Sequence, residues 1–234
     1  MKVGIIQSNY VPWRGYFDFI DEVDLFIFHD DLQYTKGDWR NRNKIKTPKG
    51  LVWLTVPVKY EQTSQRICDT RIDYSQKWRE KHLDRFRANY AKTAFFVDAM
   101  TLWEEGLSCE DLTISQVNIR LIKLISSYLG IQTPLALSSE CAATGTKTDR
   151  LIQLLRKAGA TTYLSGPSAK AYLNENLFRD HAIRLEYKNY DYPTYPQPWG
   201  EFVGMVSVLD LIANTGRKAR DYLKSQTPNT VAVG

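Results

Sequence analysis

A histidine and two carboxylates stand side by side in this sequence, directly before a dense run of cationic and amide side chains. His29 is followed by Asp30 and Asp31, and residues 33–46 read QYTKGDWRNRNKIK. Imidazole and carboxylate groups are the usual general acids and bases of enzymes. Arginine forks and side-chain amides bind phosphate or carboxylate oxygens in a fixed geometry. We therefore predict a site for an anionic small molecule, with His29, Asp30 and Asp31 as its catalytic candidates.

The substrate-binding candidates are amide, aromatic and arginine side chains, together with a small-residue loop. Flat aromatic rings can stack on sugars or nucleobases, and small residues that open a helix can offer backbone N–H groups to an anion. The candidates are Gln7, Asn9, Tyr10, Trp13, Gln33, Tyr34, Trp39, Arg40, Asn41, Arg42, Asn43, Ser165 and Gly166. Three other interpretations remain open, namely a solvated basic loop, a structural histidine at a strand end, and simple helix capping.

The elements that must position these residues alternate between short apolar runs and helical patterns. Residues 2–7 and 24–29 are predicted strands on either side of a helix over 16–23, and this is a β-loop-α-β unit. A second unit is predicted from a strand at 135–137, a helix over 149–158 and a strand at 161–164. Open α/β sheets bind ligands beyond the carboxyl ends of their parallel strands, which is where the candidates lie.

The remaining segments complete the predicted fold. We expect strands at 51–59, 67–72 and 183–187, helices between 75 and 129, and a helix over 202–214. The fold class is therefore α/β, with a mostly parallel sheet flanked by helices, two β-loop-α-β units and a helical middle section. We expect a single domain over residues 1–224 and a frayed polar tail over residues 225–234.

Composition narrows the function further. The 234 residues include 31 basic and 26 acidic side chains, a net charge of +5 that is spread along the chain. This surplus favours an anionic metabolite over a nucleic acid. The three cysteines form no CxxC pair, which favours a cytoplasmic location. No apolar run reaches the roughly 20 residues of a membrane span. Adjacent side chains on a strand point to opposite faces, so residues 29–31 predict no metal site, and no cofactor is predicted.

Several longer segments resemble the WbqC-like family of bacterial proteins, and the resemblance covers almost the whole chain in order. They are QSNYVPWRGYFDFI, DLFIFHDDLQYTKGDWRNRNKI, TKTDRLIQLL, GATTYLSGPSAKAYL and YPTYPQPWGEFVGMVSVLDLIANTG. The resemblance implies a role in the biosynthesis of O-antigen, lipopolysaccharide and other surface polysaccharides, with a nucleotide-linked or lipid-linked sugar as substrate. In many members a histidine stands at the position of Asn9, and an amide cannot replace it as an acid or base.

Within that setting, the expected reaction is N-acyl or aminoacyl transfer to a nucleotide-linked amino sugar. The expected donor is a thioester on an acyl carrier protein. Its phosphopantetheine arm would meet residues near the start of the second crossover helix, where the candidates are Ser138, Ser139, Lys147, Asp149 and Arg150. Cys141 lacks a nucleophile-elbow pattern, so we expect direct transfer without an acyl-enzyme.

Two alternatives stay open. The first is a nucleotide-binding or nucleotidyltransferase-like enzyme, because the β-loop-α-β unit resembles that architecture. YVPWRGYF, however, lacks the histidines of the corresponding phosphate motif. The second is a non-catalytic binding protein of the same pathway.

Overall fold

A six-stranded, mostly parallel sheet forms the centre of the molecule, as a computed structural model that describes residues 1–234 shows. The strand order is β5-β2-β1-β6-β7-β8. The bounds are β1 (Lys2–Ile6), β2 (Leu25–Phe28), β5 (Leu135–Leu137), β6 (Thr162–Ser165), β7 (Arg184–Tyr187) and β8 (Thr230–Val233). Every pair is parallel except β7 with β8. The predicted α/β class with a mostly parallel sheet is confirmed.

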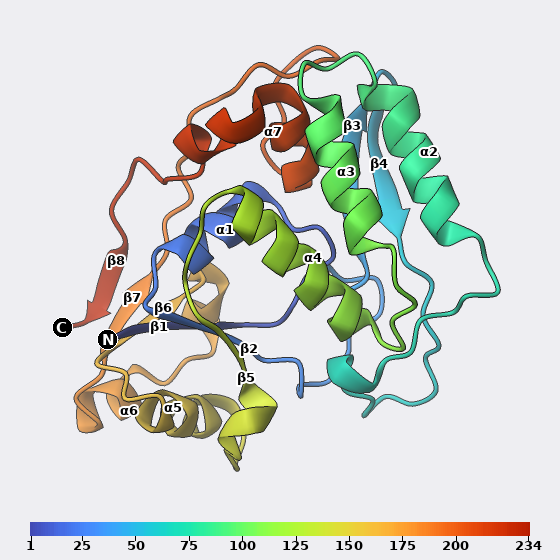
Figure 1. Ribbon diagram of the computed structural model, residues 1–234. Coiled ribbons are helices and arrows are strands. Elements are labelled where there is room, and N and C mark those ends of the chain that lie inside the picture. The colour runs from blue at the N-terminus through green and yellow to red at the C-terminus, as the bar shows by residue number, and fades with distance from the viewer.

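Helices cover both faces of this sheet (Figure 1). Helices α1 (Arg14–Asp21) and α4 (Ile114–Tyr128) lie on one face, and α5 (Lys147–Lys157) and α6 (Glu175–Asp180) lie on the other. Side chains alternate between the two faces along a strand. Phe26 and Phe28 therefore join the apolar core under α1 and α4, whereas Ile27 joins the core over α5 and α6.

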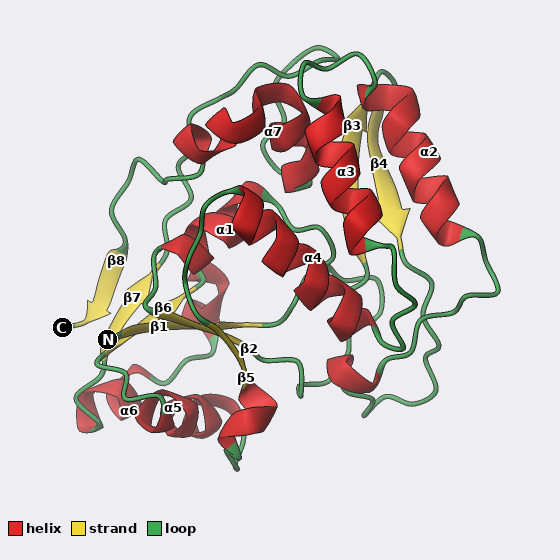
Figure 2. Ribbon diagram, in the orientation of Figure 1, coloured by secondary structure: helices red, strands yellow, loops and turns green.

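A second layer sits beside the sheet and contains the other two strands (Figure 2). The hairpin of β3 (Arg42–Thr47) and β4 (Gly50–Thr55) is antiparallel, with Arg42 opposite Thr55. It lies with α2 (Trp78–Tyr90), α3 (Phe96–Gly106) and α7 (Val208–Thr215). The interpretation of residues 42–46 as part of a loop is wrong. A lysine at position 46 does not indicate a buried strand position. In the structure, however, its Nζ donates hydrogen bonds to Gln197 and to the carbonyl of Glu201.

The order of the strands creates a crevice. Strands β1 and β2 are parallel neighbours joined through α1, as predicted. Strands β5 and β6 belong to the same sheet but are separated by β2 and β1. The chain therefore crosses the sheet through α5, on the face opposite α1. The loops after β1 and β6 leave in opposite directions, and open α/β sheets bind their ligands at such a point.

Two further expectations are corrected by the structure. Residues 67–72 do not form a strand, because Ile67–Asp69 is a short 3-10 helix. The segment after residue 225 is not frayed, because β8 pairs with β7 and buries Val233 at 4% exposure. Asn189 also donates to the carbonyl of Pro228 and ties this segment down. No helix of the structure has the length and apolar character needed to cross a membrane.

Candidate functional site

A hollow with a cavity volume of about 140 Å³ opens at the carboxyl ends of β1, β2 and β6, and we call it the strand-end pocket. Gln7 follows β1 and His29 follows β2, so the sheet itself delivers both side chains to this edge. The pocket is lined by Ile5, Gln7, His29, Leu32, Lys147, Arg150, Leu151, Tyr163 and Tyr172. Its polar members include two cations, an imidazole and an amide, which suits an anionic ligand.

A second hollow, with a cavity volume of about 100 Å³, lies against the loop after β1 and the start of β3, and we call it the aromatic pocket. Its lining consists of Asn9, Pro12, Trp13, Trp39, Asn43 and Met205. Trp13 packs edge-on against Tyr190 and Tyr192, so its ring is held in place. Two indole rings beside two amides are typical of sites for rings that carry hydroxyl or amide groups.

The guanidinium of Arg40 links the two pockets. Its Nη1 donates to Oδ1 of Asn9 at 2.6 Å, and its Nη2 donates to Oε1 of Gln7 at 3.2 Å. Asn9 lines the aromatic pocket and Gln7 lines the strand-end pocket. The backbone carbonyl of Arg40 accepts a hydrogen bond from Nδ2 of Asn118 at 2.8 Å. Arg40 is therefore held between two hollows rather than extended into solvent.

His29 is a buried imidazole with an unused nitrogen. Its Nε2 has no hydrogen-bond partner and lies 3.7 Å from Oδ1 of Asp31. Burial lowers the pKa of His29 to about 4, the charge of Asp31 acts to raise it, and the charge of Arg150 lowers it. The imidazole is therefore a neutral free base at physiological pH. Ser138 and Arg150 both donate to the carboxylate of Asp31.

Asp30 faces the other way, as strand alternation requires. It accepts hydrogen bonds from the backbone N–H and the hydroxyl of Ser8, at 2.7 and 2.6 Å, and from the hydroxyl of Ser115 at 2.5 Å. It is buried and lines neither pocket. These hydrogen bonds connect the end of β2 to the loop after β1 and to α4. They indicate a structural role for Asp30 rather than a catalytic one.

Two of the other candidates hold the loop after β1 in shape. Tyr10 is fully buried, and its hydroxyl lies 2.9 Å from Nδ1 of His82. Asn43 donates through Nδ2 to the carbonyls of Tyr10 and Val11. Val11 has a φ of 35°, a strained value for a β-branched residue. These hydrogen bonds over-determine a strained turn next to Asn9, which is a common feature of ligand sites.

Five candidates of the basic stretch lie outside both pocket linings, and one of them is Arg40, which contacts each lining only through its hydrogen bonds to Asn9 and Gln7. Gln33 pairs with Arg66, the N–H of Tyr34 donates to the carbonyl of Gln65, and Asn41 donates to the carbonyl of Val56. The guanidinium of Arg42 lies 4.1 Å from the ring centroid of Trp53. These other four residues therefore make structural contacts outside both pockets.

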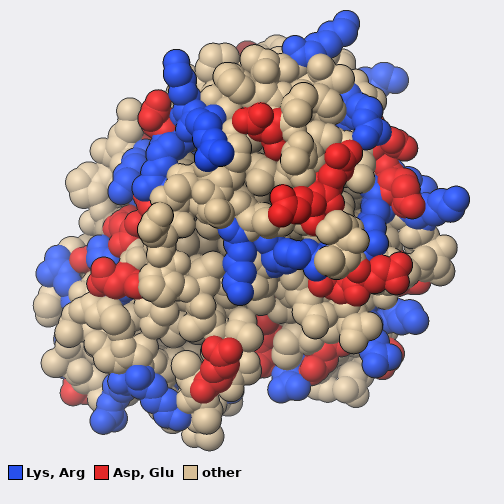
Figure 3. Space-filling view, viewed as in Figure 1, with Lys and Arg blue, Asp and Glu red and all other residues tan.

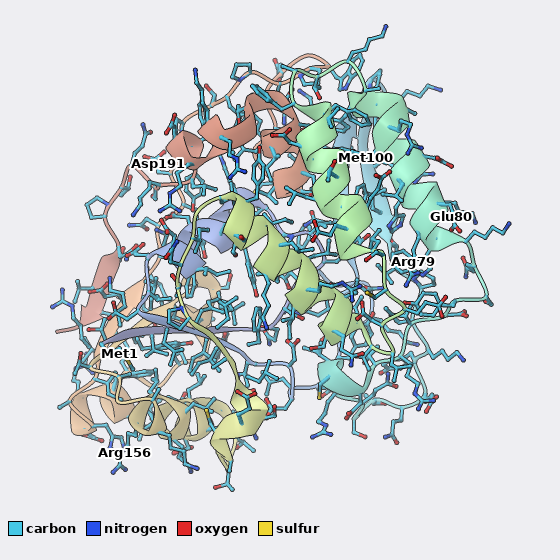
Figure 4. The ribbon with its side chains drawn as sticks, in the orientation of Figure 1. Met1, Arg79, Glu80, Met100, Arg156 and Asp191 are labelled. Atoms are coloured by element: carbon cyan, nitrogen blue, oxygen red, sulfur yellow. The ribbon has the colours of Figure 1, made fainter.

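The remaining candidates divide in the same way. Lys147 and Arg150 line the strand-end pocket from α5, whereas Arg156 of the same helix lies on the outer side of the molecule (Figure 4). Ser138 reaches the pocket only through Asp31. The hydroxyl of Ser165 is buried beside that of Tyr163. Gly166, Ser139 and Asp149 line neither pocket.

The structure adds lining residues that sequence reasoning missed. Tyr172 and Met205 come from segments far along the chain, and Tyr163 lies within β6. Tyr163 occupies a strand that was recognised, and the alternation of that strand was the available signal. Nothing local in the sequence links Met205 to Trp13. No three His, Cys, Asp or Glu residues are grouped as a metal ligand set, and Cys141 lies outside both linings.

Fold and site together define an α/β protein that carries linked ligand pockets at the carboxyl edge of a parallel sheet. The chain belongs to the WbqC-like protein family, whose sequence model matches residues 7–222. This span includes every residue of both linings except Ile5. The chain is also 47% identical over 227 residues to the uncharacterized protein Rv1507c of Mycobacterium tuberculosis (strain ATCC 25618 / H37Rv), which covers 95% of this chain and 97% of that protein. No solved structure shows significant similarity to the chain.

Proposed function

We propose that this protein is a transferase of surface-polysaccharide biosynthesis that acts on a nucleotide-linked amino sugar. The group transferred is an acyl or aminoacyl group from an activated thioester. One observation carries the proposal, namely that a single guanidinium, Arg40, is hydrogen-bonded to the walls of two separate pockets. A transferase must hold a donor and an acceptor together, whereas a binding protein needs one pocket.

The aromatic pocket suits the acceptor. Trp13 and Trp39 offer flat faces for a sugar or a base, and Asn9 offers its amide to the polar groups of that ring. Arg40 at the edge of this pocket can meet a pyrophosphate with its planar fork.

The strand-end pocket suits the donor. Lys147 and Arg150 can neutralise a phosphate of the phosphopantetheine arm. His29, as a neutral base, accepts the proton that the sugar amine loses when its nitrogen attacks the thioester carbonyl. The C–N bond then forms, the C–S bond breaks, and the imidazolium returns the proton to the departing thiolate. General acid–base help of this kind contributes typically about 10² to 10⁴ in rate.

A thermal-shift panel followed by a transfer assay tests the proposal. Nucleotide-linked amino sugars and acyl thioesters should each raise the melting temperature, and a ligand at about 100 times its Kd adds about 2.7 kcal/mol. With both present, free thiol and the acylated sugar nucleotide should appear together. Arg40→Ala should abolish the response to the sugar nucleotide. Arg87→Ala is the matched control, because that arginine is paired with Asp84 on the exposed side of α2.

Two results would contradict the proposal. Stabilisation by ATP alone, with no response to sugar nucleotides or thioesters, would favour the nucleotidyltransferase-like alternative. Stabilisation by a sugar nucleotide without any thiol release, across a range of thioesters, would leave a binding protein of the same pathway.

A further inference from the structure

His29 and Asp31 lie close together without forming a hydrogen bond. The separation of 3.7 Å between Nε2 and Oδ1 exceeds the range of N–H···O hydrogen bonds. Each oxygen of Asp31 already accepts one hydrogen bond, Oδ1 from the hydroxyl of Ser138 at 2.5 Å and Oδ2 from the guanidinium of Arg150, and these bonds hold the carboxylate at this distance from His29. The two groups therefore form an incomplete base–carboxylate pair. To complete it, the carboxylate of Asp31 must move closer to Nε2 of His29.

Arg150 is the movable partner. Its side chain keeps 19% exposure and lines the strand-end pocket, so an anion in that pocket can reach it. Its Nε is buried without a partner, and only one of its five N–H groups is engaged by Asp31. Lys147 lines the same pocket and adds a second positive charge. A phosphate placed between these cations would compete directly with Asp31 for the guanidinium.

We propose that the Arg150–Asp31 ion pair is a ligand-operated switch that turns on His29. An anion in the strand-end pocket draws the guanidinium away from Asp31. The carboxylate, then held by Ser138 alone, moves toward His29 and accepts its Nε2–H. The imidazole is then oriented with Nδ1 as its free base nitrogen, in the manner of other base–carboxylate pairs. This inference rests on the proposed function for the role of His29 as a base, and it makes Arg150 and Asp31 positioning residues.

The charges around His29 determine in which direction its pKa shifts when an anion binds. Arg150 and Lys147 approach from α5, and Asp31 approaches from the loop after β2. Tyr163 and Tyr172 add phenols, and burial raises the pKa of the Tyr163 hydroxyl. Asp30 is turned toward Ser8 and α4. A bound anion cancels the cations and leaves Asp31 as the dominant neighbour, so the pKa of His29 must rise when the pocket fills.

Histidine-selective NMR titration of the full chain, with inorganic pyrophosphate as the probe, tests this switch. The midpoint of His29, assigned with His29→Gln, should rise by about one pH unit or more when pyrophosphate saturates the pocket. His82 is an internal control, because it is also buried with a pKa of about 4 but contacts Tyr10 instead of the pocket. Its midpoint should not move.

Two variants separate the switch from a simple field effect. In Arg150→Met the midpoint of His29 should already be raised without ligand, and pyrophosphate should add little. In Asp31→Asn the rise on adding pyrophosphate should be largely lost. A His29 midpoint that pyrophosphate leaves unchanged overturns the proposal, and so does an equal pyrophosphate-dependent rise in the wild type and Arg150→Met.

The result is distinguishable from that of the proposed function. A raised midpoint without acyl transfer to any amino sugar would overturn the transferase and keep the switch. Acyl transfer with an unchanged His29 midpoint would keep the transferase and overturn the switch.

Discussion

At the scale of single residues, the planar guanidinium of Arg40 forms two hydrogen bonds that a lysine could not form together. It donates to Asn9 and Gln7 at once, and an ammonium group is a compact charge without that fixed geometry. Arg40→Lys should therefore weaken the binding of a nucleotide-linked sugar by about 10- to 100-fold, because a hydrogen bond to a charged group contributes about 1.5 to 3 kcal/mol. Isothermal titration calorimetry measures this loss.

Arg42→Lys is the matched control for that prediction. Its guanidinium lies against the ring of Trp53 and, unlike that of Arg40, makes no hydrogen bond to a residue of either lining, so the substitution should lower the melting temperature with little effect on affinity. Equal losses of affinity in the two variants would mean that the basic stretch acts only through its net charge.

Buried histidines should make the protein acid-sensitive. Burial lowers the pKa of His82 to about 4, against about 6.5 in an unfolded chain. The unfolded state therefore binds more protons between these values, and the free energy of unfolding falls as the pH drops from about 6.5 toward 4. The loss amounts to roughly 3 kcal/mol at most for this residue.

We predict that His82→Gln reduces the fall in urea midpoint between pH 7 and pH 4.5, by an amount equivalent to about 2 kcal/mol. His181→Gln, at an exposed position, is the control for loss of an imidazole outside the core. If both variants keep the wild-type slope, carboxylates such as Glu22, whose pKa is lowered by Lys188 and Lys2 against the effect of burial, must account for the acid sensitivity.

At the scale of secondary structure elements, strong apolar periodicity predicted the parallel strands and most helices, and it failed where hydrogen bonds replaced apolar packing. Strand β3 was missed because its buried positions include Asn43 and Lys46, whose polar groups are satisfied by backbone carbonyls far along the chain. Strand β8 was missed because it is short and its burial depends on one residue, Val233. Only tertiary contacts distinguish such segments from loops.

Strand β8 offers a direct test of that explanation. Val233 is 4% exposed and Val231 is 46% exposed in the same strand. Val233→Asp buries an unpaired charge and should cost about 3 kcal/mol or more, whereas Val231→Asp should cost about 0.5 kcal/mol or less. Urea unfolding measures both. Equal, small effects would show that residues 225–234 are the frayed tail that their composition indicates.

Helix α4 positions Arg40 and the loop after β1 through Asn118. Asn118 donates to the carbonyl of Arg40 at 2.8 Å and to the hydroxyl of Ser8. Asn118→Ala should cost about 2 kcal/mol, because the buried carbonyl of Arg40 is left unpaired, and it should weaken sugar-nucleotide binding. Ser126→Ala on the same helix is the control, since that buried hydroxyl has no partner to lose. A loss of stability without a change in affinity would make Asn118 purely structural.

At the scale of the whole molecule, function depends on segments that only the fold brings together. The strand-end pocket combines residues near positions 7, 29, 150 and 172, and the aromatic pocket adds Met205. The sequence indicated the strand ends, because parallel strands share a carboxyl edge. It could not indicate the strand order, which periodicity does not encode, or the partners of Met205. Basic and acidic side chains are interspersed on the face shown in Figure 3.

Linked pockets also predict the kinetic mechanism of the proposed transferase. Neither lining contains a cysteine or serine, and the thiol of Cys141 lies 3.9 Å from the carbonyl of Leu137, outside both pockets. Without an acyl-enzyme, donor and acceptor must be bound together before transfer. Initial rates measured against both substrates should then give intersecting double-reciprocal lines, and Cys141→Ser should keep close to full activity. Parallel lines with an acylated protein detectable by mass spectrometry would instead require a covalent nucleophile, and a loss of acylation in Cys141→Ser would identify it.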